Sequence, residues 1–204
     1  MATPVSIPGG RSVRASLDES DGRSIVVACP PHPEQRGHRG DPRLVTVSDA
    51  LATRGIDCIR FDYGAWDEGV GEVEDARNAL RWAAERYDSV GIFGYSFGGA
   101  IALLAAATVD RSIGAVSVLA PAHRLADELD AAAAVEELDC PLQVVFGVRD
   151  DTVDWAPVVD RATQRGAKVV ELPADHFFLG SDERIGTPVA TFFAEHLVGS
   201  RRST

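Results

Sequence analysis

The sequence predicts an α/β fold in which a mostly parallel central sheet carries helices on both faces. Short apolar runs rich in Val and Ile alternate with segments whose apolar residues recur at helical spacing. This strand-then-helix order repeats about six times, and it is typical of parallel strands joined by helical crossovers. Turns containing Gly or Pro separate many of the segments.

Six strands are expected from the short β-branched runs, at residues 24–29, 57–63, 89–95, 113–120, 141–147 and 167–173. Helices are expected between and after them, at residues 44–51, 70–87, 99–108, 123–138, 153–165 and 183–197. The helix at 123–138 is expected from composition alone. Residues 3–17 are expected to add an antiparallel edge hairpin, and residues 199–204 to form a frayed end.

Length and composition indicate one globular domain spanning residues 1–204. Hydrophobic residues make up 45% of the chain and charged residues 25%, which is ordinary for a soluble protein. No apolar run is long enough for a transmembrane helix, and the N-terminus does not resemble a signal peptide. The odd number of Cys residues, three, predicts reduced thiols and a cytoplasmic location.

The formal net charge is −11, which argues against a nucleic-acid partner because phosphate contact requires a basic surface. All basic residues except Lys168 are Arg. Adaptation to high salt and a coding bias toward GC-rich codons both explain this composition, and the sequence leaves the two open. No membrane partner is expected either, and the oligomeric state is not predicted.

The strongest functional signal is the run Gly94-Tyr95-Ser96-Phe97-Gly98, which matches G-x-S-x-G. It lies between an expected strand and a helix of small residues, where a tight turn would expose the Ser96 hydroxyl and aim the helix N-terminus at the reacting oxygen. The alternative is a glycine-rich turn in a nucleotide-binding loop. Neither G-x-G-x-x-G nor a Walker Lys is present to favour that alternative.

A serine hydroxyl needs a base to accept its proton, and the base needs an orienting acid. The strand at 141–147 leads into Asp150 and Asp151, and the strand at 167–173 leads into His176. Because parallel strands end at the same edge of the sheet, these loops are expected to meet the loop of Ser96. The order Ser, Asp, His is also that of the α/β-hydrolases.

The chain resembles the α/β-hydrolases, in particular the small, lid-poor, dienelactone-hydrolase-like serine hydrolases. The similarity covers about residues 24–197 and rests on GYSFGG (94–99), G-x-x-D-x-x-V (147–153), ADHFF (174–178) and the segment 60–82. It implies an α/β-hydrolase fold with little or no lid. In that pattern the acid follows the Gly by three residues, which selects Asp150; Asp151 is the second choice, and Asp154 is disfavoured because a helix is expected to begin there.

Two N–H groups are expected to hold the oxyanion that acyl transfer generates. One is the backbone N–H of Phe97, directly after Ser96. The other is the backbone N–H of His32, because proline has none and His32 is the only possible donor within residues 30–33. The alternative for this segment is a rigid surface turn.

About twenty residues separate the strands at 113–120 and 141–147, and we expect a shallow, open pocket as a result. Its apolar walls are expected from five aromatic side chains: Tyr63, Trp66, Phe97, Phe177 and Phe178. At least one of the last two is expected in the core. Arg36, Arg39 and Arg43 are interpreted as a solvated loop rather than a site for an acidic substrate. The group Glu72, Glu74, Arg77 and Arg81 is interpreted as a solvated helix face, not a metal site.

These observations favour a cofactor-free serine hydrolase that cleaves small esters or thioesters, with Ser96 as nucleophile, His176 as general base and Asp150 as orienting acid. Two alternatives stay open. One is an acyltransferase or perhydrolase that uses the same acyl-enzyme. The other is a binding protein on a hydrolase fold with a dormant triad.

Overall fold

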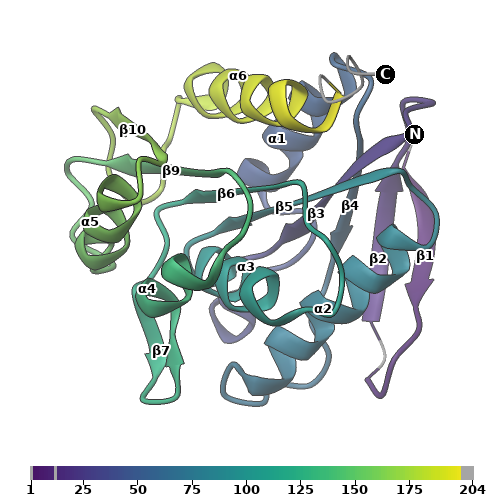
Figure 1. Ribbon diagram of the computed structural model, residues 1–204, viewed down its shortest axis with the longest axis horizontal. Coiled ribbons are helices and arrows are strands. Elements are labelled where there is room, and N and C mark those ends of the chain that lie inside the picture. The colour runs from purple at the N-terminus through teal and green to yellow at the C-terminus, as the bar shows by residue number, and fades with distance from the viewer. Residues whose placement is uncertain (1, 12, 199–204) are drawn as a thin grey trace.

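The computed structural model describes residues 2–11 and 13–198, and an eight-stranded sheet runs through its centre (Figure 1). The strand order is β1-β2-β4-β3-β5-β6-β9-β10. The strands are β1 Thr3–Ile7, β2 Val13–Asp18, β3 Ser24–Cys29, β4 Asp57–Phe61, β5 Ser89–Tyr95, β6 Ala115–Leu119, β9 Leu142–Gly147 and β10 Lys168–Leu172.

Six neighbouring strands pair in parallel, in the order β4-β3-β5-β6-β9-β10. Strands β1 and β2 form the expected antiparallel hairpin at one edge of the sheet, where β2 pairs antiparallel with β4. Strands β3, β4, β6 and β9 are buried along their whole length, as befits parallel strands covered on both faces. Their carboxyl ends all lie at one edge of the sheet, which brings the following loops together.

Helices cover both faces of the sheet, which confirms the predicted fold class. Helices α1 (Pro42–Ala52) and α6 (Asp182–Phe193) pack on one face, above the sheet in Figure 1. Helices α2 (Val70–Ala84), α3 (Phe97–Thr108) and α5 (Ala156–Gln164) contribute to the hydrophobic core on the other face. Helices α1, α2, α5 and α6 each bury one side, whereas α3 is buried continuously from Phe97 to Ala105.

The prediction of a helix over residues 123–138 is wrong for most of that segment. The segment forms a small hairpin of β7 (Arg124–Ala126) and β8 (Leu129–Asp130), then one helical turn, α4 (Ala131–Ala134), and a 3-10 turn, Val135–Glu137. Four consecutive Ala residues favour a helix, and the Asp130 side chain caps it by accepting from the Ala133 N–H. The residues before them lack an apolar stripe that a helix could bury.

Smaller differences affect the helix ends. Helix α3 begins at Phe97, two residues earlier than expected, and α5 begins at Ala156, with Pro157 in its first turn. The last helix passes into a turn of π-helix at Ala194–Val198. The frayed end expected at 199–204 lies outside the described residues. No helix among those that are described combines the length and apolar character needed to cross a bilayer.

Candidate active site

Ser96 occupies a strained turn between β5 and α3. Its backbone φ of 58° and ψ of −119° are unusual for a residue with a side chain. The flanking glycines allow the turn, since a Cβ on Gly94 would lie 2.0 Å from the Gly98 carbonyl oxygen. A Cβ on Gly98 would lie 2.3 Å from the carbonyl oxygens of Cys29 and Pro30. The second glycine therefore lets the end of β3 and its loop approach the turn.

The structure brings Ser96, His176 and Asp150 into contact in series. The Nε2 atom of His176 lies 3.0 Å from the Ser96 Oγ, and its Nδ1 atom lies 2.7 Å from the Asp150 Oδ2. An ionised carboxylate can only accept hydrogen bonds, so Nδ1 must carry a hydrogen and donate a hydrogen bond to Asp150. The neutral imidazole then has a free lone pair on Nε2, which accepts a hydrogen bond from the Ser96 hydroxyl.

Asp150 rather than Asp151 faces the imidazole. The Asp150 side chain is fully buried, and its Oδ1 accepts hydrogen bonds from the backbone N–H groups of Thr152 at 2.9 Å and Val153 at 3.4 Å. Asp151 is exposed. Asp154 lies with His123, whose Nδ1 is 3.1 Å from the Asp154 carbonyl oxygen. The loops after β9 and β10 are in direct contact, because the Arg149 N–H donates to the Ala174 carbonyl oxygen at 3.0 Å.

The backbone of His176 is anchored by Tyr95, a residue whose role the sequence did not suggest. The Tyr95 hydroxyl donates to the His176 carbonyl oxygen at 2.9 Å, and the two rings lie 5.4 Å apart. Burial raises the pKa of the Tyr95 hydroxyl to about 12, so it stays protonated and remains a donor. The Asp175 carboxylate also accepts from the N–H groups of Phe177 and Phe178, which fixes the turn after the imidazole.

His32 and Phe97, the residues expected to supply the oxyanion donors, lie side by side, with ring centroids 4.8 Å apart. Phe97 is the first residue of α3, so its N–H has no acceptor within the helix. His32 precedes a 3-10 turn, Pro33–Gln35, and its ring accepts from the Glu34 N–H at 3.3 Å. Its carbonyl oxygen accepts from Gln35 and Gly37, which makes the loop compact.

An open cavity of about 290 Å³ lies over Ser96 and His176. Its walls combine the 31–37 loop, the start of α1 and the turns that carry the three aligned side chains. Phe177 lines this cavity with half of its surface exposed, whereas Phe178 is buried in the core, as expected for one of the pair. Tyr63 and Trp66 do not line it; they support the two residues that do, His32 and Phe97.

The three loop arginines have different surroundings. Arg36 is exposed at the cavity, in line with the solvated-loop interpretation. Arg39 binds Asp62 instead, through both its backbone N–H and its guanidinium. Arg43 also lines the cavity but is only 17% exposed, so that interpretation is wrong for this residue. Its guanidinium lies 4.6 Å from the centre of the Tyr95 ring and bonds to Asp41.

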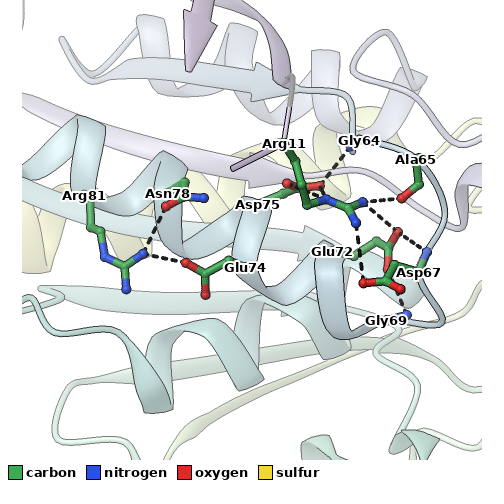
Figure 2. Close-up of polar contacts among 10 residues, drawn as sticks. All are labelled: Arg11, Gly64, Ala65, Asp67, Gly69, Glu72, Glu74, Asp75, Asn78 and Arg81. Carbon is green, nitrogen blue, oxygen red and sulfur yellow. Dashed lines mark hydrogen bonds and ion pairs between the residues drawn. The ribbon is translucent and has the colours of Figure 1, made fainter. Parts of the chain in front are cut away.

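The prediction of a solvated charged face on α2 is partly wrong. Glu74 does pair with Arg77 and Arg81 at the surface, but the Glu72 side chain is fully buried and contacts Arg11 of the edge hairpin (Figure 2). Within residues 2–11 and 13–198, no group of three or more His, Cys, Asp or Glu side chains is placed to hold a metal ion.

The sequence profile of the dienelactone hydrolase family matches residues 60–188, which is more than half of the chain and includes Ser96, Asp150 and His176. The chain belongs to the dienelactone hydrolase family. This confirms the expected resemblance and the prediction of an enzyme that hydrolyses ester bonds. No curated protein matches this hydrolase in sequence.

Solved structures of α/β-hydrolases share the fold. An α/β serine hydrolase homologue from Coxiella burnetii is 25% identical, with a TM-score of 0.80 over 93% of this chain and 96% of the other. A member of the α/β serine hydrolases without a lid, from Xanthomonas campestris, is 22% identical, with a TM-score of 0.81 over 100% and 96%. Est1E from Butyrivibrio proteoclasticus with bound ferulic acid is 17% identical, with a TM-score of 0.79 over 94% and 98%.

Proposed function

We propose that this hydrolase cleaves small esters or thioesters through an acyl-enzyme on Ser96. The observation that carries the proposal is the unbroken series of contacts from the Asp150 carboxylate through the His176 imidazole to the Ser96 hydroxyl. Such a series makes a serine hydroxyl nucleophilic at neutral pH because the imidazole accepts its proton as the new bond forms.

In the first half-reaction the Ser96 Oγ attacks the ester carbonyl carbon while its proton moves to Nε2 of His176. Asp150, held at Nδ1, stabilises the resulting imidazolium. The negative charge on the former carbonyl oxygen is held by the backbone N–H groups of Phe97 and His32. The imidazolium then gives its proton to the departing alcohol or thiol as the bond to the acyl carbon breaks.

In the second half-reaction water attacks the acyl-enzyme. His176 accepts a proton from the water, and the same two N–H groups hold the second oxyanion. The imidazolium returns its proton to the Ser96 oxygen as the acyl–oxygen bond breaks, which releases the carboxylic acid and restores the free enzyme.

Small substrates fit the open cavity best. Its volume of about 290 Å³ suits a short acyl chain or one aromatic ring, and Phe177 supplies an apolar surface beside His176. The binding of ferulic acid, a small aromatic acid, to the structurally similar Est1E supports this size class. The net charge of −11 argues against a nucleic-acid partner, and a small-molecule ester is the partner that we propose. The three cysteines are free, which supports the cytoplasmic location that we propose.

Steady-state hydrolysis of nitrophenyl esters and acyl-CoA thioesters of increasing acyl length tests this proposal. Wild-type protein should show a rapid burst of nitrophenol equal to the enzyme concentration when deacylation is slow, and Ser96→Ala should show no turnover. Preference for short acyl chains over long ones is expected, because an open cavity would leave the end of a long chain in water. A clear preference for long chains would contradict the open-cavity argument, and product formed on an added alcohol or peroxide would identify an acyl transfer.

A further inference from the structure

Two carboxylates are buried beneath the loop that joins β4 to α2, residues 62–69. The side chains of Glu72 and Asp75 come from the first turns of α2 (Figure 2). Neither side chain has any solvent exposure. Buried carboxylates are costly unless they are paired and hydrogen-bonded. Burial raises the pKa of Asp75, in keeping with that cost. The partners of these two carboxylates therefore indicate their structural role.

Both carboxylates bind the backbone of this loop. Asp75 accepts from the Gly64 N–H at 2.8 Å, and Glu72 accepts from the N–H groups of Asp67 at 3.1 Å and Gly69 at 2.8 Å. These three donors flank the segment that carries Trp66. The two carboxylates thus set the path of the loop on either side of that residue.

Arg11, from the turn between β1 and β2, provides the positive charge. Its guanidinium lies 3.0 Å from Asp75 and 3.3 Å from Glu72, and it also donates to the Ala65 carbonyl oxygen. A glycine makes room for it, because a Cβ on Gly71 would lie 1.9 Å from the Arg11 Nη1. The helix therefore presents a space shaped for this guanidinium, between two acids and against a residue without a side chain.

The loop held in this way contacts both residues proposed as oxyanion donors. The Trp66 ring lies 4.6 Å from the His32 ring and 5.8 Å from the Phe97 ring. The Tyr63 hydroxyl donates to the carbonyl oxygen of Pro30 at 3.0 Å. The position of the segment 30–32 thus depends on a loop whose own backbone is fixed by Arg11, Glu72 and Asp75.

We propose that Arg11 is a positioning residue for the oxyanion hole, acting through Glu72, Asp75 and the Trp66 loop on the backbone of His32. The proposal rests on the proposed function, since it needs an oxyanion to be stabilised there. It assigns to the edge hairpin, remote from Ser96 in the sequence, an effect on the chemical step. Small displacements of such donors lower rates strongly, because the donors must meet the charge of the transition state.

A matched ion pair on the same helix provides the control. Arg81 pairs with Glu74 and hydrogen-bonds to Asn78 on α2, as Figure 2 shows beside the Arg11 group, and these partners lie outside the loops of the site. It also pairs with Asp110. Arg81→Ala therefore removes an arginine with similar partners from the same helix. Its kcat should stay within about twofold of wild type, as for most surface changes.

Arg11→Ala should lower kcat and kcat/KM together by about 10- to 100-fold with KM almost unchanged, because the lost interaction acts in the transition state. Gly71→Ala should act in the same direction by displacing the guanidinium while keeping every charge. It serves as the second variant should Arg11→Ala not fold, since Ala also favours the helix. Trp66→Ala and the double variant Arg11→Ala/Trp66→Ala complete a double-mutant cycle, in which the combined loss should be well below the product of the single losses.

The exposure of Trp66 gives a readout that does not depend on activity. In a background of Trp82→Phe and Trp155→Phe, Trp66 is the sole indole, and acrylamide should quench it more strongly after Arg11→Ala or Gly71→Ala. The acid limb of the pH profile of kcat/KM should not move, because His176 and Asp150 keep their contacts.

Several results would overturn the inference. One is a folded Arg11→Ala or Gly71→Ala protein with kcat within twofold of wild type and unchanged quenching. A second is an Arg11→Ala protein in which only KM rises. A third is a double-mutant cycle in which the loss of kcat in Arg11→Ala/Trp66→Ala equals the product of the two single losses. An inactive wild-type protein that a fluorophosphonate does not label would instead overturn the proposed function, and the quenching data would still report on the loop.

Discussion

Replacing Asp150 by Asn tests the orienting role of the carboxylate with almost no change in shape. The Asp150 Oδ1 accepts from the backbone N–H groups of Thr152 and Val153, so the amide oxygen of an Asn should take this place. The amide NH₂ would then face Nδ1 of His176 and donate to it. That interaction favours the tautomer with the proton on Nε2, which cannot accept the proton of Ser96.

The size of the expected loss of activity follows from the loss of His176 as general base. In serine hydrolases the same change lowers kcat by about 10⁴, so we expect a loss of about 10³- to 10⁴-fold, equivalent to about 4 to 5.5 kcal/mol of transition-state stabilisation. The melting temperature should change little, because the hydrogen bonds are kept and no unpaired charge is left behind. The assay is kcat/KM for nitrophenyl acetate near neutral pH.

Asp151→Asn is the matched control, because it is the same substitution one residue further along the chain at an exposed position. Its activity should stay within about twofold of wild type, as for most surface changes. The reasoning would be refuted by a folded Asp150→Asn protein that keeps a tenth of the wild-type activity, or by equal losses in the two variants.

Substitutions at two positions and one labelling experiment probe the loops and the core. His32→Ala should lower kcat less than His32→Pro, for which we expect a loss of about 10²- to 10³-fold, since only the second removes the backbone donor; equal losses in steady-state assays would point to the ring instead. Gly98→Ala should lower the free energy of unfolding in urea by about 1 to 3 kcal/mol, because its Cβ would lie 2.3 Å from the Cys29 carbonyl oxygen; an unchanged midpoint would contradict that contact. Burial raises the pKa of all three thiols, but only Cys140 is partly exposed, so at pH 8 a disulfide reagent should modify Cys140 well before Cys29 and Cys58, and all three thiols quickly after unfolding; fast labelling of a second native thiol would show that the core is open.

The parts of the site that local patterns determine could be predicted from the sequence. The strained turn at Ser96 needs a glycine on each side, and the pattern G-x-S-x-G records this need directly. The loops of Asp150 and His176 could be placed beside it because parallel strands end at one edge of the sheet. Their side-chain contacts then follow the positions expected from the resemblance to the hydrolases.

Features that depend on distant residues could not be predicted. Glu72 lies in the same charged stretch of α2 as Glu74, Arg77 and Arg81, yet its partner is Arg11, 61 residues earlier in the chain. The hydroxyl of Tyr95 finds its acceptor 81 residues later, at the His176 carbonyl oxygen. No local periodicity encodes such contacts. A glycine at 71 was one available signal, since it suggests a close approach in the first turn of a helix.

The prediction of a helix over residues 123–138 was wrong for another reason. Its alanines favour a helix, but propensity alone rarely sustains one without an apolar stripe to bury. The residues before Ala131 instead form a hairpin, across which Arg124 pairs with Asp130. The composition correctly indicated a helical turn at the alanines. The lack of apolar residues at helical spacing before Ala131 indicated that the helix is short.

Covalent labelling of the Ser96 hydroxyl tests the central claim most directly. A fluorophosphonate incubated with the folded protein should form one adduct, which peptide mass spectrometry should locate on Ser96, and labelling should be slowed strongly by His176→Ala. Folded wild-type protein that stays unlabelled, or an adduct on another residue that persists in Ser96→Ala, would contradict the account.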